Sequence, residues 1–211
     1  MQKALPTRVE IIALDLSEDR APFQLYNFCK DKQVDLLVNN AGYGLFGTFD
    51  QIDLEDELHM LNVNIRALHI LTKLFLRDFK NRNRGRILNV ASSAGFLSGP
   101  LLSSYYASKN YVVRLTLAIY EELRRAHSKV TVSLLCPGPV DTNFNNRAGV
   151  QFSMPPASPK KVARYGIDGA LRGKLILIPG MGVRLGVFAS RFVPHKMMSA
   201  ITYEIQKKKL K

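Results

Sequence analysis

The sequence alternates short runs of β-type residues with longer segments of helical periodicity, and this alternation strongly constrains the fold. It is typical of βαβ units, in which crossover helices join parallel strands. We expect strands at residues 8–16, 34–39, 86–92, 129–136 and 174–178. Four of them are nearly continuous apolar runs, as expected for strands that helices cover on both faces. The expected fold class is therefore α/β, with a doubly wound parallel sheet.

The helical segments between these runs are also visible. The best-defined one spans residues 53–79, where side chains suited to burial recur at alternating steps of four and three residues. We expect one continuous buried stripe and an N-cap at Asp53. The stripe consists of Leu54, Leu58, Leu61, Ile65, Leu68, Thr72, Phe75 and Phe79, in which Thr72 is the only polar residue. Further helices are expected at residues 21–30, 104–126 and 159–171.

Composition and length indicate one folded domain over residues 1–211. Hydrophobic residues make up 46% and charged residues 22%, which is ordinary for a soluble folded protein. No apolar run approaches the length of a membrane span, and the first residues do not resemble a signal peptide. The two cysteines, Cys29 and Cys136, lack metal-type spacing, so we expect no metal site and reduced thiols in a cytoplasmic protein.

Positive charge is concentrated near the end of the chain. The sequence has 30 Lys and Arg against 17 Asp and Glu, a net charge of +13. From Ala157 onward there are 12 basic and two acidic residues, which leaves only +3 for the first 156 residues. This distribution argues against a uniformly basic surface that binds nucleic acid. Residues 183–211 form a basic tail that is either simply solvated or in contact with anionic lipid or an acidic partner.

Tyr105 and Lys109 are four residues apart in an expected helix, so they share one face with their Cβ atoms about 5–6 Å apart. A phenol has a pKa of about 10, and a cation within about 4–6 Å favours the phenolate. Alone, such a pair is usually a surface packing pair. However, Ser92 precedes Tyr105 by 13 residues and ends an expected strand, at the sheet edge where ligands bind in parallel sheets.

The neighbouring strands also end in candidate binding residues. Asn39, Ala41 and Gly42 follow one strand, and Pro137, Gly138, Val140 and Thr142 follow another. Asn64 is a polar residue beside the buried stripe of the first long helix, where it would be tolerated only with hydrogen-bonding partners.

Together these motifs resemble the single-domain form of the short-chain dehydrogenase/reductase family. Five signatures match in order: Asp15-Leu16 after a strand, NNAG at residues 39–42, the helical Asn64, Ser92 with YxxxK at Tyr105 and Lys109, and PGxVxT at residues 137–142. Tyr106 and Ser93 duplicate two of these residues, but only Tyr105 and Ser92 have the family's spacing. The resemblance covers residues 8–179 and implies a Rossmann-like doubly wound parallel sheet.

The resemblance implies an NAD(P)-dependent oxidoreductase that transfers hydride to a carbonyl or from a secondary alcohol. By this resemblance, Tyr105 is the general acid or base, and Lys109 lowers its pKa and contacts the nicotinamide ribose. Ser92 holds the substrate oxygen, and Asn64 organises a water molecule.

The resemblance also implies cofactor contacts to NAD(P)(H), with NAD and NADP both open. Asp15 and Leu16 resemble the adenine contacts, and Asn39, Ala41 and Gly42 the wall along the adenosine ribose. Val140 and Thr142, which follow Pro137 and Gly138, resemble the contacts to the nicotinamide carboxamide.

One family motif does not occur in this sequence. The family begins with a strand, a TGxxxGxG turn, a helix and a second strand, so we expect an N-terminally incomplete sheet that lacks the first two strands and their helices. The glycine turn normally brings backbone amides to the pyrophosphate, so we expect little cofactor affinity for this chain alone. The strand at residues 8–16 would lose its neighbours, so either it moves or the natural protein is longer. The alternative function is a truncated or inactive remnant that acts as a binding or interaction module.

The substrate indicated by the sequence is an apolar small-molecule carbonyl or alcohol. Phe96 and Leu97 lie near the catalytic motifs, and Val150, Phe152 and Met154 lie in residues 146–157, where the family places its substrate loop. By resemblance, the two long helices pair subunits into a homodimer or homotetramer.

The tail carries a second apolar pattern. Six apolar residues, Phe188, Phe192, Val193, Met197, Met198 and Ile201, alternate with Arg191 and Lys196. This pattern indicates either a surface-seeking helix interrupted by Pro194, in weak peripheral contact with a membrane, or a lid over an apolar substrate.

Overall fold

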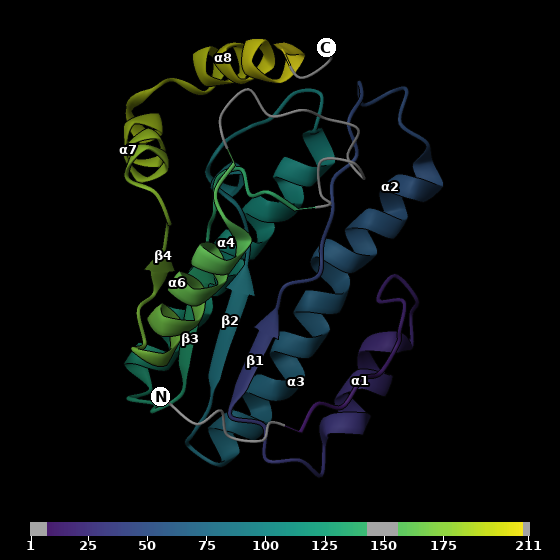
Figure 1. Cartoon of the computed structure of the whole chain (residues 1–211), viewed down its shortest axis with the longest axis vertical. Helices are drawn as coiled ribbons and strands as arrows, with labels where there is room; N and C mark the ends of the chain where they lie inside the picture. The colour runs from purple at the N-terminus through teal and green to yellow at the C-terminus, as the bar shows by residue number, and fades with distance from the viewer. Residues whose placement is uncertain (1–7, 143–155, 209–211) are drawn as a thin grey trace, which may run out of the picture.

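The computed structural model contains one sheet of four parallel strands in the order β1-β2-β3-β4 (Figure 1). The structure describes residues 8–142 and 156–208. The strands are β1 (Leu36–Asn39), β2 (Arg86–Val90), β3 (Thr131–Leu135) and β4 (Ile176–Leu177). In register, Leu37 lies beside Ile87, which in turn lies beside Val132. Because all strands run the same way, their carboxyl ends meet at one edge of the sheet, and the expected α/β class is confirmed.

Helices connect these strands and continue beyond them. They are α1 (Ala21–Cys29), α2 (Leu54–Leu61), the π-helix η1 (Asn62–Ala67), α3 (Leu68–Asn81), the 3₁₀ helix η2 (Ser93–Phe96), α4 (Ser103–Arg125), α6 (Pro159–Leu171), α7 (Met181–Ala189), the 3₁₀ helix η3 (Ser190–Phe192) and α8 (His195–Lys207). The helices expected at residues 21–30, 104–126 and 159–171 are confirmed to within one residue at each end.

The two faces of the sheet pack against different helices, because successive side chains of a strand point in opposite directions. Ile87 and Val132 pack with Phe75 and Phe79 of α3 and with residues of α4. Leu88, the next residue in β2, packs instead with residues of α6 on the other face. Burial on both faces explains why the strands are apolar throughout.

The predicted strand at residues 8–16 is wrong. Residues 8–15 adopt no regular secondary structure and take no place in the sheet. Val9 and Ile11 are 74% and 88% exposed, so this apolar run is not part of the core. The physical reason is that a strand needs a neighbour for its backbone hydrogen bonds, and the described residues provide no partner strand beside this segment.

The long helix expected at residues 53–79 is confirmed as a helical segment but differs in two ways. It passes through the π-helix η1, and its buried stripe covers only the second part. Phe75 and Phe79 are buried, whereas Leu54 and Leu58 are exposed, because α2 extends past the carboxyl end of β1 (Figure 1). Asp53 caps the segment as expected, since its side chain accepts hydrogen bonds from the backbone amides of Glu55 and Asp56 at 2.9 and 3.2 Å.

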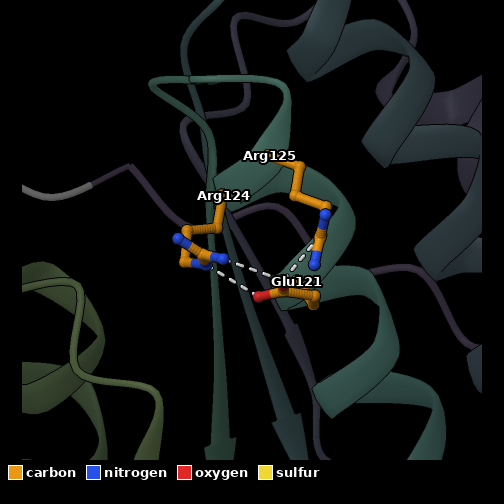
Figure 2. Close-up of polar contacts among 3 residues, drawn as sticks. All are labelled: Glu121, Arg124 and Arg125. Carbon is orange, nitrogen blue, oxygen red and sulfur yellow. Dashed lines mark hydrogen bonds and ion pairs between the residues drawn. The ribbon is translucent and has the colours of Figure 1, made fainter.

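The last turn of α4 carries a local charge cluster (Figure 2). Glu121 accepts hydrogen bonds from the Nε atoms of Arg124 and Arg125 at 2.7 and 2.8 Å. These hydrogen bonds lower the pKa of Glu121 to about 2, and the bond from Arg124 has the larger effect. Both cations near this end of α4 are therefore paired with the same carboxylate.

The remaining expectations concern the two cysteines, membrane-spanning helices and metal sites, and the substrate loop. Cys29 and Cys136 are both free thiols. Among residues 8–142 and 156–208, no helix has the length and apolar composition to cross a bilayer, and no cluster of His, Cys, Asp and Glu could hold a metal ion. Residues 1–7, 143–155 and 209–211 lie outside the described residues, and with them the expected substrate-loop side chains Val150, Phe152 and Met154.

Phe79 should be the most sensitive large side chain of the α3 face. It is fully buried, and Gly85, at φ +144°, leaves room for its ring: a Cβ on Gly85 would lie 2.2 Å from the ring. Phe79→Ala should lower the free energy of unfolding by about 3–5 kcal/mol in urea denaturation, because it removes buried surface and leaves a cavity. The control Phe49→Ala, at an exposed phenylalanine, should change it by less than about 0.5 kcal/mol. Equal losses in the two variants would contradict this packing.

Candidate active site

Tyr105 and Lys109 lie in the first turns of α4. Lys109 is only 4% exposed, whereas Tyr105 is partly exposed. The Lys109 Nζ atom donates a hydrogen bond to the backbone oxygen of Val90 at 3.2 Å and lies 5.8 Å from the centroid of the Tyr105 ring. An ammonium group is therefore held between the end of β2 and the tyrosine.

Ser92 joins this pair from the end of β2. Its Oγ atom accepts a hydrogen bond from the backbone amide of Ala94 at 3.1 Å, which caps η2. Its side chain also forms a hydrogen bond with Tyr105. The backbone amide of Ser93 donates to the oxygen of Pro137 at 2.9 Å, so the segments after β2 and β3 remain side by side past the ends of the strands. The structure thus brings Ser92, Tyr105 and Lys109 together at the carboxyl edge.

Asn64 is fully buried in the π-helix η1, and such single π-turns are frequent at functional sites. Its Nδ2 atom donates to the backbone oxygen of Tyr43 at 2.8 Å and to Ser108 Oγ at 3.0 Å, and its Oδ1 atom accepts from the Tyr43 amide at 3.1 Å. Asn64 therefore fastens the segment after β1 to α4.

Gly42 brings the backbone after β1 close to Asn64 and Lys109. A Cβ atom at this position would lie 2.8 Å from Asn64 Oδ1 and 3.0 Å from Lys109 Nζ. A larger residue would have to push against the buried asparagine or displace the ammonium group. Glycine is therefore required at residue 42 if the turn after β1 is to lie against Asn64 and Lys109.

The electrostatics differ from the sequence expectation in one respect. Burial raises the pKa of Tyr105 to about 12, although the hydrogen bond with Ser92 lowers it in part. The net shift of the Tyr105 pKa is therefore upward, opposite to the expected direction. The reason is burial, which disfavours any charged form: it also lowers the pKa of Lys109 to about 8.

Cys136 lies behind the site and is fully buried at the end of β3. Burial raises the pKa of its thiol to about 12, with smaller lowering effects from Lys109 and from the Ser92 backbone. A thiol with this pKa stays protonated near neutral pH, so Cys136 acts in this structure as a buried packing residue.

Asn39 is placed differently from the other residues of the NNAG turn. Its Nδ2 atom donates to Thr72 Oγ1 at 3.0 Å and to Asn89 Oδ1 at 2.9 Å, and Asn89 donates to Thr116 Oγ1 at 3.0 Å. The Asn39 side chain therefore belongs to a buried network between the sheet and the helices α3 and α4. The network also explains why the buried stripe of α3 contains Thr72.

The PGxVxT segment is held at the same edge. Ala157 donates to the oxygen of Pro139 at 2.9 Å, and Asp141 donates to the oxygen of Ala157 at 3.0 Å. Val140 forms an isolated parallel bridge with Ala157, and a Cβ on Gly138 would lie 2.7 Å from a methyl group of Val183 in α7. Pro137, Gly138 and Val140 are thus fixed between β3 and α7, and Thr142 is exposed.

Asp15 and Leu16 stand apart from this arrangement because they do not follow a strand. Asp15 accepts hydrogen bonds from the backbone amide and the hydroxyl of Ser17 at 2.9 and 2.7 Å. Asp19 pairs with Arg66 of η1 at 2.8 Å and so attaches this turn to the helical layer. The expected adenine contacts, Asp15 and Leu16, therefore lie in a loop and turn, whereas the other site residues follow strands or lie in helices.

Two residues that organise the site, Ser108 and Asn110, were not predicted from the sequence. Ser108 donates to the backbone oxygen of Tyr105 at 2.7 Å and accepts from Asn64. Asn110 donates to the oxygens of Leu97 and Tyr106 at 2.8 and 3.0 Å, which fixes the segment after η2 against α4. The sequence feature that could have indicated them is that Ser108 and Asn110 are polar residues on either side of Lys109 within a long helix.

Comparisons with known proteins agree with this geometry. A family model described as short chain dehydrogenase matches residues 1–151. The chain is 38% identical over 113 residues to 2-dehydro-3-deoxy-D-gluconate 5-dehydrogenase of Bacillus subtilis strain 168, covering 54% of this chain and 44% of that protein. It is 32% identical over 181 residues to estradiol 17-beta-dehydrogenase 11 of Mus musculus, covering 83% and 59%. It is 30% identical over 153 residues to retinol dehydrogenase 8 of Bos taurus, covering 72% and 48%. The chain thus spans about half the length of the curated relatives it matches.

Solved structures share the fold at lower sequence identity. A short-chain dehydrogenase from Sphingobium yanoikuyae in complex with NADPH superposes with a TM-score of 0.73 at 24% identity, covering 83% of this chain and 70% of that one. A short-chain dehydrogenase/reductase from Burkholderia phymatum in complex with NAD gives a TM-score of 0.72 at 24% identity, covering 82% and 71%. These likenesses support the Rossmann-like fold.

Burial of Lys109 should give the protein a distinctive pH dependence. The unfolded chain keeps this ammonium group up to about pH 10.5, whereas the folded chain loses it near pH 8. The unfolded state therefore binds more protons between these values, and stability should rise with pH in this window. Relative to Lys109→Met, the wild-type free energy of unfolding should rise by about 2 kcal/mol between about pH 8 and pH 10.

Urea denaturation at several pH values measures this difference. The control Lys80→Met removes an exposed lysine and should follow the wild type at every pH. Parallel curves for the wild type and Lys109→Met would show that the ammonium group is not desolvated.

Proposed function

Because the chain belongs to the short-chain dehydrogenase family, we propose that it is an NAD(P)-dependent oxidoreductase that reduces a carbonyl or oxidises a secondary alcohol. The observation that carries this proposal is the hydrogen bond between Ser92 and Tyr105 beside the buried Lys109. Two hydroxyl groups directed at one point can hold a single substrate oxygen, and the adjacent ammonium group can stabilise the charge left on the tyrosine.

Proton transfer follows from the protonation states. With a pKa of about 12, Tyr105 is a neutral phenol near pH 7 and can donate a proton to a carbonyl oxygen as that oxygen gains negative charge. Ser92 holds the same oxygen by a hydrogen bond. The phenolate that remains is stabilised by the Lys109 ammonium group, and in alcohol oxidation the phenolate accepts the proton instead. Asn64 supports this arrangement by holding α4 through Ser108.

The residues of the carboxyl edge fit the nicotinamide end of an NAD(P)(H) molecule. The close approach of Gly42 to Lys109 leaves a glycine-walled surface beside an ammonium group, as a ribose requires. We assign the ribose to Tyr105 and Lys109 and the carboxamide to Pro137, Gly138, Val140 and Thr142. Ala41, Gly42 and the Asn39 backbone would line the adenosine ribose, with Asp15 and Leu16 toward the adenine. When bound, the nicotinamide supplies or accepts the hydride.

We propose that the substrate is an apolar small molecule. Phe96 and Leu97 are partly exposed beside Ser92, where they can contact an apolar substituent of the reacting carbon. Two relatives are named for apolar alcohols, estradiol and retinol, whereas another is named for a sugar acid. The position of Phe96 and Leu97 favours the apolar class.

We also propose that the protein is a homodimer or homotetramer in the cytoplasm. The exposed Leu54 and Leu58 on α2 and Tyr111 on α4 give apolar surface beside the two long helices, which the resemblance assigns to subunit pairing.

A cofactor-free binding or interaction module is the second candidate. It is favoured by residues 8–15, which adopt no regular secondary structure and add no strand to the described sheet. Both candidates keep the same fold and differ in whether the carboxyl edge binds a dinucleotide.

Replacing Tyr105 should test the catalytic assignment. At millimolar NADH or NADPH, with a panel of apolar ketones, Tyr105→Phe should lower kcat/KM by about 10²- to 10⁴-fold, because it removes the proton donor. The control Tyr106→Phe keeps the ring that packs beside Gly99 and should leave kcat/KM near the wild-type value. The change in reduced-nicotinamide absorbance measures both. Equal rates in Tyr105→Phe and the wild type would overturn the assignment, and no turnover by the wild type would favour the second candidate.

Cofactor affinity should be weak in this chain. Because the sequence lacks the glycine turn that anchors the pyrophosphate, fluorescence titration of NADH or NADPH should show no saturation in the micromolar range. Gly42→Val, which would displace Lys109, should remove the residual binding at millimolar concentration. Micromolar binding by the 211-residue chain would contradict this prediction.

A further inference from the structure

The helices α7, η3 and α8 form an arm at the end of the molecule to which the strands point (Figure 1). One side of the arm faces the rest of the protein. Val187, Thr202 and Gln206 are buried, and Gln206 donates a hydrogen bond to the hydroxyl of Tyr106. The hydroxyl groups of Ser199 and Ser98 are 2.6 Å apart. The arm is therefore fixed to the region around η2 and the first turns of α4.

The other side of the arm is apolar and exposed. It consists of Met181, Leu185, Phe188, Phe192, Met197, Ile201 and Ile205. From Met181 to Phe192, through α7 and η3, these side chains are spaced four, three and four residues apart. In α8 they are spaced four residues apart, so each helical segment has one apolar stripe. Phe188 and Phe192 are 57% and 75% exposed and stack edge to face at 5.4 Å. Apolar surface gathered in this way, unlike scattered single residues, marks an interaction surface.

Basic residues surround these stripes. Arg184, Arg191, Lys196, Lys207 and Lys208 are all exposed, and Glu204 is the only acidic residue between Met181 and Lys208. Within the described ranges, none of these five cations takes part in an ion pair. Arg124 and Arg125 at the far end of α4 contrast with them, since both form ion pairs with Glu121 (Figure 2).

We propose that the arm is an interaction surface for anionic lipid membranes, with its apolar stripes in the interface and its cations against the headgroups. Amphipathic helices bind membranes through buried apolar side chains together with attraction to anionic lipid. A second copy of the chain is a poorer partner, because pairing this surface with itself would bring like charges together. A role as substrate lid would use the buried side of the arm and leaves the apolar stripes without a partner.

The proposal does not rest on the enzymatic function. Through Gln206 and Tyr106, the arm lies next to the helix turn that carries Tyr105. If the proposed oxidoreductase activity is also correct, the membrane would lie beside the site and could supply an apolar substrate. Lipid binding can be measured without any cofactor or turnover.

Vesicle sedimentation with the full 211-residue chain tests the role of charge. The wild type should bind phosphatidylcholine vesicles that contain phosphatidylserine far better than vesicles of phosphatidylcholine alone. Arg184→Gln/Arg191→Gln should weaken binding about 30-fold, since each cation near an anionic surface contributes a factor of about five. The matched control Lys80→Gln/Lys129→Gln removes two exposed cations near the opposite edge of the sheet and should bind like the wild type.

A second pair of variants tests the apolar stripes. Phe188→Ser/Phe192→Ser should lose at least about tenfold in binding to the same vesicles. The control Phe23→Ser/Phe49→Ser alters two exposed phenylalanines elsewhere and should retain binding. Circular dichroism should show that all variants fold, as expected for exposed positions.

Three outcomes would overturn the proposal. The first is equal binding to vesicles with and without phosphatidylserine, or none to either. The second is the same loss in the arm variants and their controls. The third is a wild-type dimer that Phe188→Ser/Phe192→Ser converts to a monomer without any vesicle binding, which would assign the stripes to a second copy.

Discussion

The site depends on keeping an ammonium group out of water at the end of β2. Lys109 is buried against the oxygen of Val90 and close to Gly42, and its pKa falls to about 8 because of this burial. A buried cation is costly unless polar groups surround it, so the segments after β1 and β2 must both approach α4 closely. That approach requires glycine at residue 42 and brings Ser92 to Tyr105. The geometry of the candidate active site is thus largely a consequence of accommodating one lysine.

Two polar networks keep this geometry in place. Asn64 connects Tyr43 to Ser108, and Asn110 fixes the segment after η2 to α4, so both loops of the site are attached to one rigid helix. Beneath them, Asn39, Asn89, Thr72 and Thr116 bond to one another between the sheet and its helices. Buried polar groups that satisfy one another specify a unique packing, because any shift would leave a donor or acceptor unpaired. The carboxyl edge can therefore hold hydroxyl groups in fixed positions at strand ends.

Local patterns predicted the parts of this structure that local physics determines. The strands from Leu36 onward, the cap at Asp53 and the Tyr105–Lys109 pair follow from apolar runs and helical spacing, which act within a few residues. The segment at residues 8–16 failed because a strand is made by its neighbours, and an apolar run cannot show whether they are present. The exposure of Leu58 and the burial of Asn39 also depend on distant elements. The direction of the Tyr105 pKa shift was missed for the same reason, since burial is a property of the whole fold.

The two sides of α8 connect the site with the surface that we propose for lipid. Gln206 is buried and bonded to Tyr106, whereas Ile205, the residue before it, is exposed on the apolar stripe. Tyr106 adjoins Tyr105, and their rings are 6.1 Å apart, so the surface that we propose for lipid would be in contact with the first turn of α4. The fold thus places an apolar surface, a fixed helix turn and the proposed acid–base residue Tyr105 in one continuous series of contacts.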